Sequence, residues 1–333
     1  MKTRKNGIFP AIILSISIGL LSACGQTATG EKKLEKIRLD YAFYSPTSLV
    51  LKEFGWLEED LKDEGIEVEW VQSLGSNKAL EFLNSNSIDF GSTAGAAALI
   101  AKANNAPIES VYIYSKPEWT ALVTQGETEL TSVSDLKGKK VAATLGTDPH
   151  IFLLRSLADA GLKPTDVEIV NLQHGDGASA LVSGQVSAWA GLDPHMAVLE
   201  VKNGTSYIYR NTEFNTYGTL NVRTDFAKNY PEHVEKVIEL YEQARAWTIE
   251  NPEEAAKILA EQAQLDAAVA KLQLSRNDFS NPIPSEVQVK ALIEAGKVLQ
   301  TSGIIDSNVN VEKLATELIQ STFATNVIKL EDE

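Results

Sequence analysis

The sequence is poor in the residues that most often bind metals or form covalent cross-links. It contains a single cysteine, Cys24, and four histidines in 333 residues. One thiol cannot form a disulfide within the chain. A zinc site is recognisable from sequence when two histidines lie one helical turn apart or when cysteines and histidines cluster, and neither pattern occurs. We therefore expect no metal site and assign no cofactor.

Positive charge is also scarce. The chain has 30 Lys and Arg residues against 45 Asp and Glu residues, a formal net charge of -15. The resulting field repels both nucleic acid and an anionic membrane surface, so neither is expected as a partner. The sequence also lacks low-complexity tracts, heptad runs and solenoid repeats. Its length is sufficient for one large hydrophobic core or for two.

The one extended apolar segment, residues 9–21, follows the basic start MKTRK. This arrangement, ending in small residues, is typical of a signal peptide rather than of a membrane-spanning helix. The tetrapeptide LSAC resembles the lipobox of bacterial lipoproteins, in which the cysteine is lipidated. The resemblance implies a signal peptide over residues 1–23, a lipid on Cys24 and, in the polar residues 24–35, a flexible tether. It places the protein outside the cytoplasm, attached to the bacterial cell membrane only through that lipid.

From residue 36 onward short apolar runs alternate with amphipathic stretches, a pattern typical of βα units around mostly parallel sheets. This alternation is interrupted near residue 130 and then resumes. We predict an α/β fold of two lobes, with residues 36–121 plus 222–325 in lobe 1 and residues 122–221 in lobe 2. The chain is expected to cross between lobes near Thr120–Gly126 and Gly218–Thr224. Ligands of open α/β sheets bind beyond the carboxyl ends of the strands, so two facing lobes predict one shared cleft.

The tripeptide Asp-Pro-His occurs twice, at residues 148–150 and 193–195, each time between an apolar strand and an apolar helix. An Asp and a His two positions apart cannot share a helix face, which argues against a metal or catalytic pair. Asp is a favoured N-cap and Pro a favoured first helical residue. We therefore interpret both copies as helix starts in which the histidines follow incidentally.

Two other motifs imitate enzyme signatures. Gly175–Ala180 fits the dinucleotide pattern GxGxx(G/A), but two residues separate it from the preceding strand and its helix is short. Gly91–Gly95 imitates the nucleophile elbow but has Thr at the central position. We interpret both as helix starts and predict no catalytic residue.

Four loops after predicted strands share glycine, hydroxyl side chains and a following helix. Such helix starts bind anions through free N–H groups without needing Lys or Arg. One loop of this kind is an ordinary cap, but four on two facing lobes favour a small anionic ligand. The loops are Ser45–Ser48, Ser73–Lys78, Gly91–Ala96 and Leu145–His150.

Several segments resemble, in order and spacing, the substrate-binding lipoproteins of bacterial ABC importers for aliphatic sulfonates and taurine. They include NSNSIDFGSTAGAAALIAKA, SVSDLKGKKVAATLGTDPHIFLLRSLADAGL and GQVSAWAGLDPHMA. The resemblance covers roughly Lys36 to Pro252. It implies the two-lobed type II periplasmic-binding fold, partnership with an ABC permease and ATPase, and a monomeric binding protein that is not an enzyme. The predicted ligand-binding residues are Ser45, Thr47, Gly75, Ser76, Ser92, Thr93, Trp119, Gly146, Thr147 and Asp193.

The sequence also departs from this family. Gly191-Leu192 stand where a bulky residue is common, Thr93–Ala97 replace a proline-containing segment, and Pro46 and Trp119 lie near pocket positions. These differences leave several ligands open: an aliphatic or aromatic sulfonate, nitrate, bicarbonate or a thiamine precursor. Two other functions also remain open, an enzyme on the same scaffold and a binding module that serves a sensor.

Overall fold

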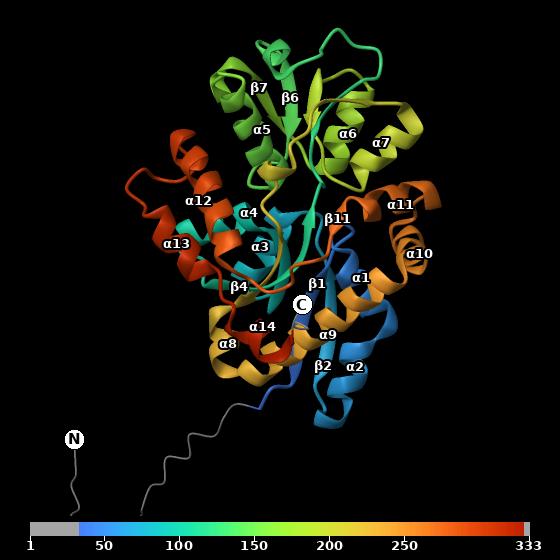
Figure 1. The fold of residues 1–333 in the computed structure, drawn as a ribbon, viewed down its shortest axis with the longest axis vertical. Helices are drawn as coiled ribbons and strands as arrows, with labels where there is room; N and C mark the ends of the chain where they lie inside the picture. The colour runs from blue at the N-terminus through green and yellow to red at the C-terminus, as the bar shows by residue number, and fades with distance from the viewer. Residues whose placement is uncertain (1–32, 330–333) are drawn as a thin grey trace, which may run out of the picture. The chain divides into compact units, whose positions relative to one another are not determined.

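Strands and helices alternate along the chain and build two β-sheets, one above the other in Figure 1. The computed structural model describes residues 33–329. From Leu34 onward these residues form one compact unit. The predicted signal peptide, Cys24 and nearly all of the predicted tether lie outside the described residues.

The first sheet has the strand order β11-β4-β10-β3-β1-β2. β1 runs parallel to β2 and β3, whereas β10 runs antiparallel to both of its neighbours. Its strands are β1 (Lys36–Tyr41), β2 (Glu67–Gln72), β3 (Phe90–Ala94), β4 (Ile108–Pro117), β10 (Gly218–Arg223) and β11 (Asn277–Asp278).

The second sheet has the order β7-β6-β8-β5-β9. β6 is parallel to β7 and β8, and β5 is antiparallel to β8 and β9. Its strands are β5 (Leu122–Thr124), β6 (Lys140–Ala143), β7 (Glu168–Asn171), β8 (Ala188–Ala190) and β9 (Ser206–Tyr209).

Fourteen α-helices cover the sheets within the described residues. Three of them, α1, α9 and α10, begin at a proline, whose fixed φ suits the first helical position. The helices are α1 (Pro46–Phe54), α2 (Trp56–Leu61), α3 (Ser76–Asn84), α4 (Gly95–Ala103), α5 (Asp148–Asp159), α6 (His174–Val182), α7 (His195–Asn203), α8 (Thr224–Asn229), α9 (Pro231–Glu250), α10 (Pro252–Ala263), α11 (Ala267–Ser275), α12 (Glu286–Thr301), α13 (Val311–Leu318) and α14 (Thr322–Val327). None of the described helices combines the length and the hydropathy that a membrane span requires.

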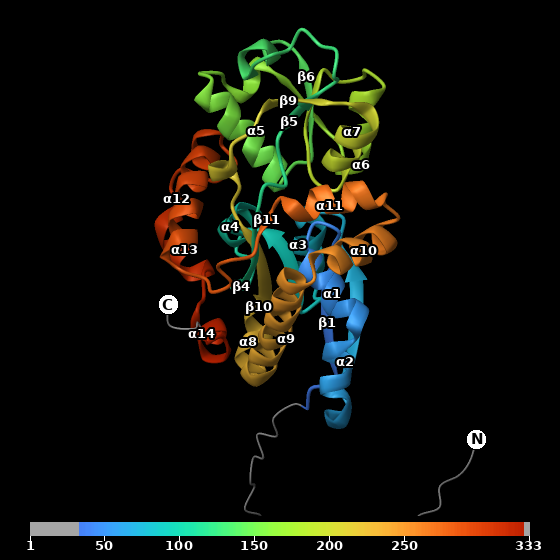
Figure 2. The same cartoon turned by 45° about the vertical axis from the view of Figure 1, so that its right-hand side comes forward.

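Each sheet has its own hydrophobic core. One large cluster of buried side chains surrounds the first sheet. The second sheet has two clusters, one containing Phe152 of α5 and the other containing Met196 of α7. Figures 1 and 2 show α5 on one side of this sheet and α6 and α7 on the other. These helices fix the loops that follow the parallel strands, where the two sheets meet.

The predicted α/β class and two-lobed fold are confirmed, but the sheets are mixed rather than mostly parallel. The chain enters the second sheet at the edge that faces the first, because Leu122 of β5 pairs with Ala190 at the end of β8. It returns in the same way, since Gly218 of β10 pairs with Ala94 at the end of β3. Both entering strands therefore run antiparallel to the strands beside them. The chain returns through residues 210–217, directly before the range near which the crossing was predicted, because Gly218–Arg223 forms β10 of the first sheet.

The C-terminal helices contact both sheets' helices. α12 packs against α4 and α5, and α11 packs against α7. Figure 2 shows α11 at the level where the two sheets face each other. Residues far along the chain are thereby brought to the site between the sheets.

Candidate functional site

A cavity of about 320 Å³ lies between the two sheets. It is built from the loops that follow β1, β2, β7 and β8, so it occupies the carboxyl ends of parallel strands from both sheets. Three larger hollows, two of about 410 Å³ and one of about 510 Å³, are lined by other residues. The lining residues of the cavity between the sheets are Phe43, Tyr44, Ser73, Leu74, Gln173, His174, Gly175, Asp176, Leu192, Asp193, Pro194 and His195.

The structure divides the ten predicted ligand-binding residues into three groups. Asp193 lines the cavity, and Gly75 borders it, because a Cβ at Gly75 would lie 2.8 Å from His174 Nε2. Gly146 is half-buried, and a Cβ there would meet no atom. The others are buried: Ser45, Thr47, Ser76, Ser92, Thr93, Trp119 and Thr147.

The buried hydroxyls among these residues differ in whether they have a partner. Ser76 Oγ accepts from Ala94 N at 2.9 Å, Thr147 Oγ1 donates to Thr144 O at 2.6 Å, and Thr93 Oγ1 accepts from Asn221 Nδ2 at 2.8 Å. These three hydroxyls stabilise the protein's own loops and strands. The hydroxyls of Ser45, Thr47 and Ser92 are buried without any hydrogen-bond partner among the described residues.

Two tyrosine hydroxyls, those of Tyr114 and Tyr241, are likewise buried without a partner among the described residues. Tyr241 lies beside Ser92, and Tyr114 lies near Tyr241. Ser45 and Thr47 follow Tyr44, whose hydroxyl donates to Ser92 O at 3.0 Å. We call these five residues, Ser45, Thr47, Ser92, Tyr114 and Tyr241, the hydroxyl cluster. An unpaired buried hydroxyl costs about 1–3 kcal/mol, so a molecule that supplies the missing partner is stabilised by each of them.

Asp40 of β1 is a buried carboxyl next to the hydroxyl cluster. Its oxygens accept from Ser73 Oγ at 2.6 Å and from Ser92 N at 2.7 Å. No Lys, Arg or His within the described residues forms an ion pair with it. Burial raises the pKa of Asp40 to about 7, although the hydrogen bonds from Ser73 and Ser92 oppose the shift. The group is therefore poised to hold a proton near neutral pH.

The helix starts near this site also have backbone N–H groups that no side chain caps. α1, α3 and α5 begin without a side-chain cap hydrogen bond. Ser92 and Thr93 were expected at a helix start and instead lie in β3, because the strand continues to Ala94 before α4 begins at Gly95. Their burial in a strand explains why Thr93 bonds to β10 instead of capping a helix.

The first Asp-Pro-His copy was wrongly interpreted as an N-cap. Thr147 is the N-cap of α5, and Asp148 is its first helical residue. Asp148 is buried and accepts from Trp119 Nε1 at 2.8 Å and from Thr216 Oγ1 at 2.7 Å. Trp119 and Thr216 belong to the two segments that link the sheets, so Asp148 fixes both linkers to α5. The ring of Trp119 packs edge-on against Tyr44, with ring centroids 5.8 Å apart.

The second copy does cap its helix, although from one position further out. Pro194 is the N-cap of α7, and Asp193 Oδ1 accepts from the first-turn Ala197 N at 2.9 Å. Both carboxylate oxygens also accept from Arg276 Nη1, at 2.9 and 3.0 Å. Burial raises the pKa of Asp193 to about 6, while the charge and hydrogen bonds of Arg276 oppose the shift. Asp193 is therefore occupied by protein partners even though it lines the cavity.

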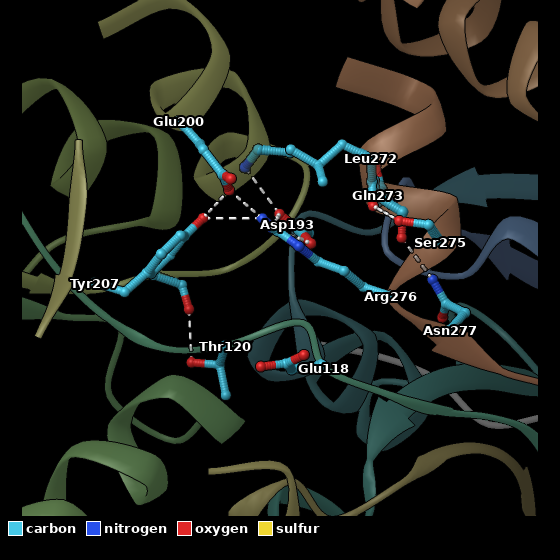
Figure 3. A network of polar contacts seen from close by, with 12 residues as sticks. Glu118, Thr120, Asp193, Glu200, Tyr207, Leu272, Gln273, Ser275, Arg276 and Asn277 are labelled. Atoms are coloured by element: carbon cyan, nitrogen blue, oxygen red, sulfur yellow. Dashed lines mark hydrogen bonds and ion pairs between the residues drawn. The ribbon is translucent and has the colours of Figure 1, made fainter. Parts of the chain in front are cut away.

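Arg276 is the centre of a paired network, shown in Figure 3. It follows α11 and reaches Asp193, Glu200 of α7 and Tyr207 of β9. Its Nη2 donates to Tyr207 Oη at 2.9 Å, and that hydroxyl donates to Glu200 at 2.5 Å. We call these four residues the arginine cluster. It joins the C-terminal segment of the first sheet to the second sheet.

Two histidines belong to the cavity, one of them from the second Asp-Pro-His copy. His174 and His195 both line the cavity. Burial lowers the pKa of His174 to about 3, with a further lowering from His195, and burial also lowers the pKa of His195. Both rings are therefore neutral at pH 7. His150 of the first copy is buried, and burial lowers its pKa to about 4.

The described residues do not suggest a metal or nucleotide site. They contain no group of three His, Cys, Asp or Glu side chains that could hold a metal ion. The Gly175–Ala180 motif lies inside α6, and a Cβ at Gly177 would lie 2.6 Å from Trp189 Nε1. Gly177 therefore permits close packing of α6 on the sheet.

Sequence analysis missed the residues that contribute most to this site. Ser73 belongs to a loop it did identify, Tyr44 directly precedes another, and His174 follows a strand, so position after a strand was a usable signal. Arg276 lies 83 positions from Asp193 and follows an ordinary helix, so no local pattern indicated it.

Comparison with known proteins agrees with this architecture. The chain matches the family described as NMT1/THI5 like over residues 50–255. It is 27% identical over 323 residues to a putative aliphatic sulfonates-binding protein of Bacillus subtilis, covering 96% of each chain. It is 29% identical over 276 residues to a protein of the same description from Escherichia coli, covering 82% of this chain and 86% of that one.

A solved structure shows the same fold. The alkanesulfonate-binding protein SsuA from Xanthomonas axonopodis pv. citri, bound to MOPS, superposes with a TM-score of 0.78 at 24% identity. The match covers 85% of this chain and 98% of that chain. The two-sheet architecture is therefore that of periplasmic binding proteins.

Proposed function

The chain belongs to the NMT1/THI5-like family, and from that premise we propose that it is a solute-binding protein for a small organic anion, most simply a sulfonate. The anion is held between the two sheets and delivered to an ABC permease with its ATPase. In this proposal residues 36–121 and 218–325 form one lobe and residues 122–217 form the other, so that β10 stays with the first sheet. The relatives named as aliphatic sulfonates-binding proteins support this ligand class.

The hydroxyl cluster is the observation that carries the proposal. Its five hydroxyls are buried and lack partners among the described residues. Sulfonate oxygens only accept hydrogen bonds, so they match a set of unpaired hydroxyl donors. Bonds to a charged acceptor are the stronger kind, which offsets the loss of water from the anion. A sulfonate within this cluster would give each hydroxyl the partner that it lacks.

The net charge of -15 does not oppose anion binding at this place. Surface charges more than about 10 Å away are largely screened by salt, whereas groups inside a cleft are not. The uncapped starts of α1, α3 and α5 present free N–H groups and the positive ends of helix dipoles. Local dipoles therefore stabilise the anion without a lysine or arginine in contact with it.

The cavity favours an organic anion over nitrate or bicarbonate. A volume of about 320 Å³ lies in the range of cavities that hold small organic molecules. Phe43, Tyr44 and Leu74 give one side of it an apolar lining. An organic group gains binding energy from this surface, and an inorganic ion does not.

Entry of the ligand requires motion, because the hydroxyl cluster is buried. In the proposed cycle the two sheets separate about the segments 118–121 and 210–217, admit the anion and close again. The lipid predicted on Cys24 would keep the protein at the outer face of the cell membrane, next to its permease.

Isothermal titration calorimetry of the purified protein tests this function. The panel is ethanesulfonate, taurine, benzenesulfonate, nitrate and bicarbonate. We expect binding of at least one sulfonate and much weaker binding of the two inorganic ions. If none of the three sulfonates binds, the ligand class is wrong.

A further inference from the structure

One ring nitrogen in the cavity wall, on His174, is buried and unpaired. His174 is 2% exposed, and its Nε2 has no hydrogen-bond partner among the described residues. Its other nitrogen, Nδ1, lies 3.1 Å from Thr144 Oγ1. A buried ring nitrogen without a partner costs free energy unless another molecule provides one.

Thr144 fixes which nitrogen of His174 carries the proton. Thr144 Oγ1 donates its only hydrogen to Leu172 O at 2.7 Å. Toward His174 the same oxygen can therefore only accept, so Nδ1 must carry the hydrogen. The unpaired Nε2 is then a bare lone pair, a hydrogen-bond acceptor. The low pKa of His174 keeps it in this neutral form.

We propose that His174 is a specificity-determining residue that accepts a hydrogen bond from the ligand, so that the site selects organic anions carrying an N–H or O–H donor. This inference rests on the proposed function. The acid group faces the donors of the hydroxyl cluster, and the opposite end of the ligand faces the acceptor on His174. A ligand whose far end is a hydrocarbon leaves that lone pair buried and unpaired.

Neighbouring groups support an acceptor-rich end of the site. Gln173 Oε1 and Asn77 Oδ1 are also buried without a partner among the described residues. An amide can turn over and offer a donor instead, so these two groups support the proposal but do not carry it. Asp176, with its carboxylate, lines the same part of the cavity.

The absence of a side chain at Gly75 keeps this acceptor accessible. A Cβ there would lie 2.8 Å from His174 Nε2 and 2.9 Å from Asn77 Oδ1. Any larger residue would therefore cover the lone pair. Gly75 lies in the loop after β2 of the first sheet and His174 begins α6 after β7 of the second, so the two meet when the sheets are close together.

Three probes of equal heavy-atom number test the proposal: taurine, 2-hydroxyethanesulfonate and 1-propanesulfonate. They share a sulfonate on a two-carbon spacer and differ at the terminal group, which at pH 7 is an ammonium in taurine, a hydroxyl or a methyl. The hydroxyl and methyl compounds have the same charge, so their comparison isolates the hydrogen bond. We expect the wild-type protein to bind the amine and the hydroxyl about tenfold or more tighter than the methyl compound, as a hydrogen bond made or lost at a buried polar group implies. Equal binding of all three probes would overturn the inference while leaving the proposed function intact.

Two substitutions separate selection from structure. Asn at position 174 places its amide where Nδ1 lies, so His174→Asn keeps the contact with Thr144 and removes the Nε2 acceptor. His174→Gln places a polar atom where Nε2 lies. We expect His174→Asn to abolish the preference among the probes and His174→Gln to retain part of it. A uniform loss for all three probes in His174→Asn would indicate a structural role and contradict the proposal.

The control is His233→Asn, which alters a histidine of α9 whose partner is Glu64. It should leave all three affinities unchanged. Thermal unfolding of every variant establishes that it is folded before its affinities are compared. Binding of the probes only in the presence of a divalent cation would also overturn the inference, because His174 Nε2 would then be a metal ligand.

Discussion

The two polar clusters have opposite characters: the arginine cluster joins the two sheets, and the hydroxyl cluster lies on strands of the first sheet and the helices beside it. In the arginine cluster every charged group has a partner, and Arg276 and Asp193 have side chains only 7% and 2% exposed. In the hydroxyl cluster five buried hydroxyls have no partner among the described residues. The hydrogen bonds of a paired network stabilise the fold, whereas unpaired hydroxyls can still form hydrogen bonds with another molecule. The comparison separates residues that stabilise the site from residues that we propose bind the ligand.

The two buried carboxyls next to these clusters show the same contrast. Asp193 has Arg276 as a counter-ion, and Asp40 has only neutral donors, Ser73 and Ser92. Burial without a counter-ion raises the pKa of Asp40 further, to about 7 compared with about 6 for Asp193. The difference in surroundings should therefore be visible in pH-dependent stability.

The largest expected effect is on Asp40. Its pKa rises from 3.8 in the unfolded chain to about 7 in the folded protein, so the folded state binds the extra proton between these values. The contribution of Asp40 to the free energy of unfolding is therefore complete below about pH 4 and is lost as pH rises through 7. At about 1.4 kcal/mol per pKa unit, the loss is about 4 kcal/mol. Asp40→Asn imitates the protonated form, because Ser73 can turn its hydroxyl and accept from the new amide. Urea unfolding at pH 4, 5, 6, 7 and 8 should show the variant gaining stability relative to wild type as pH rises.

The matched control for this comparison is Asp135→Asn. Asp135 is exposed, and hydrogen bonds from Thr131 and Ser132 lower its pKa. Its contribution has the opposite sign, since stability is present above the unfolded pKa and lost as pH falls. Parallel stability curves for wild type and Asp40→Asn would show that Asp40 ionises normally and would remove the contrast with Asp193.

Removing the centre of the arginine cluster should have the next largest effect. Arg276→Met keeps the aliphatic stem but leaves Asp193 buried without its cation. Breaking one side of a buried ion pair costs about 3 kcal/mol or more in the free energy of unfolding. Arg210→Met removes a cation from an exposed pair with Glu118 and should cost less than about 1 kcal/mol. Urea denaturation of both variants measures the difference, and equal losses would mean that the arginine cluster contributes no more than a surface ion pair.

The sequence predicted the fold well because the fold depends on local periodicity. The strand and helix pattern of Glu67–Asn84, for example, follows from an alternating run, a Gly-Ser break and an amphipathic run, and it matches β2 and α3. The return crossing could be placed only approximately, because GTLNVR indicates a strand without indicating its sheet. Pairing with β3 and β4, more than 100 positions away, decides that.

The candidate site was only partly predictable for a similar reason. Loops rich in Gly and Ser located the region, but the partner of each hydroxyl depends on the tertiary structure. Ser76 and Ser92 looked equivalent in sequence, and only the structure shows that Ser76 accepts from Ala94 N while Ser92 has no partner among the described residues. Asp148 looked like a helix cap in the sequence. Its actual partners, Trp119 and Thr216, lie in distant segments and could not be recognised there.

The smallest expected effect distinguishes those two serines and tests the comparison most directly. Ser92→Ala removes a buried hydroxyl without a protein partner, so the free energy of unfolding should not fall and should rise by about 1 kcal/mol. Sulfonate affinity should fall about tenfold, because the variant loses a donor to a charged acceptor.

Ser76→Ala is the matched variant, since it leaves Ala94 N without its acceptor and should cost about 1 kcal/mol in stability. Urea denaturation and calorimetry with the tightest-binding sulfonate are measured on both variants. If Ser92→Ala lowers stability as much as Ser76→Ala and leaves affinity unchanged, Ser92 has a structural role. The unpaired hydroxyls would then not indicate the ligand site, because a hydroxyl that binds the ligand must contribute to affinity and not to the stability of the unliganded protein.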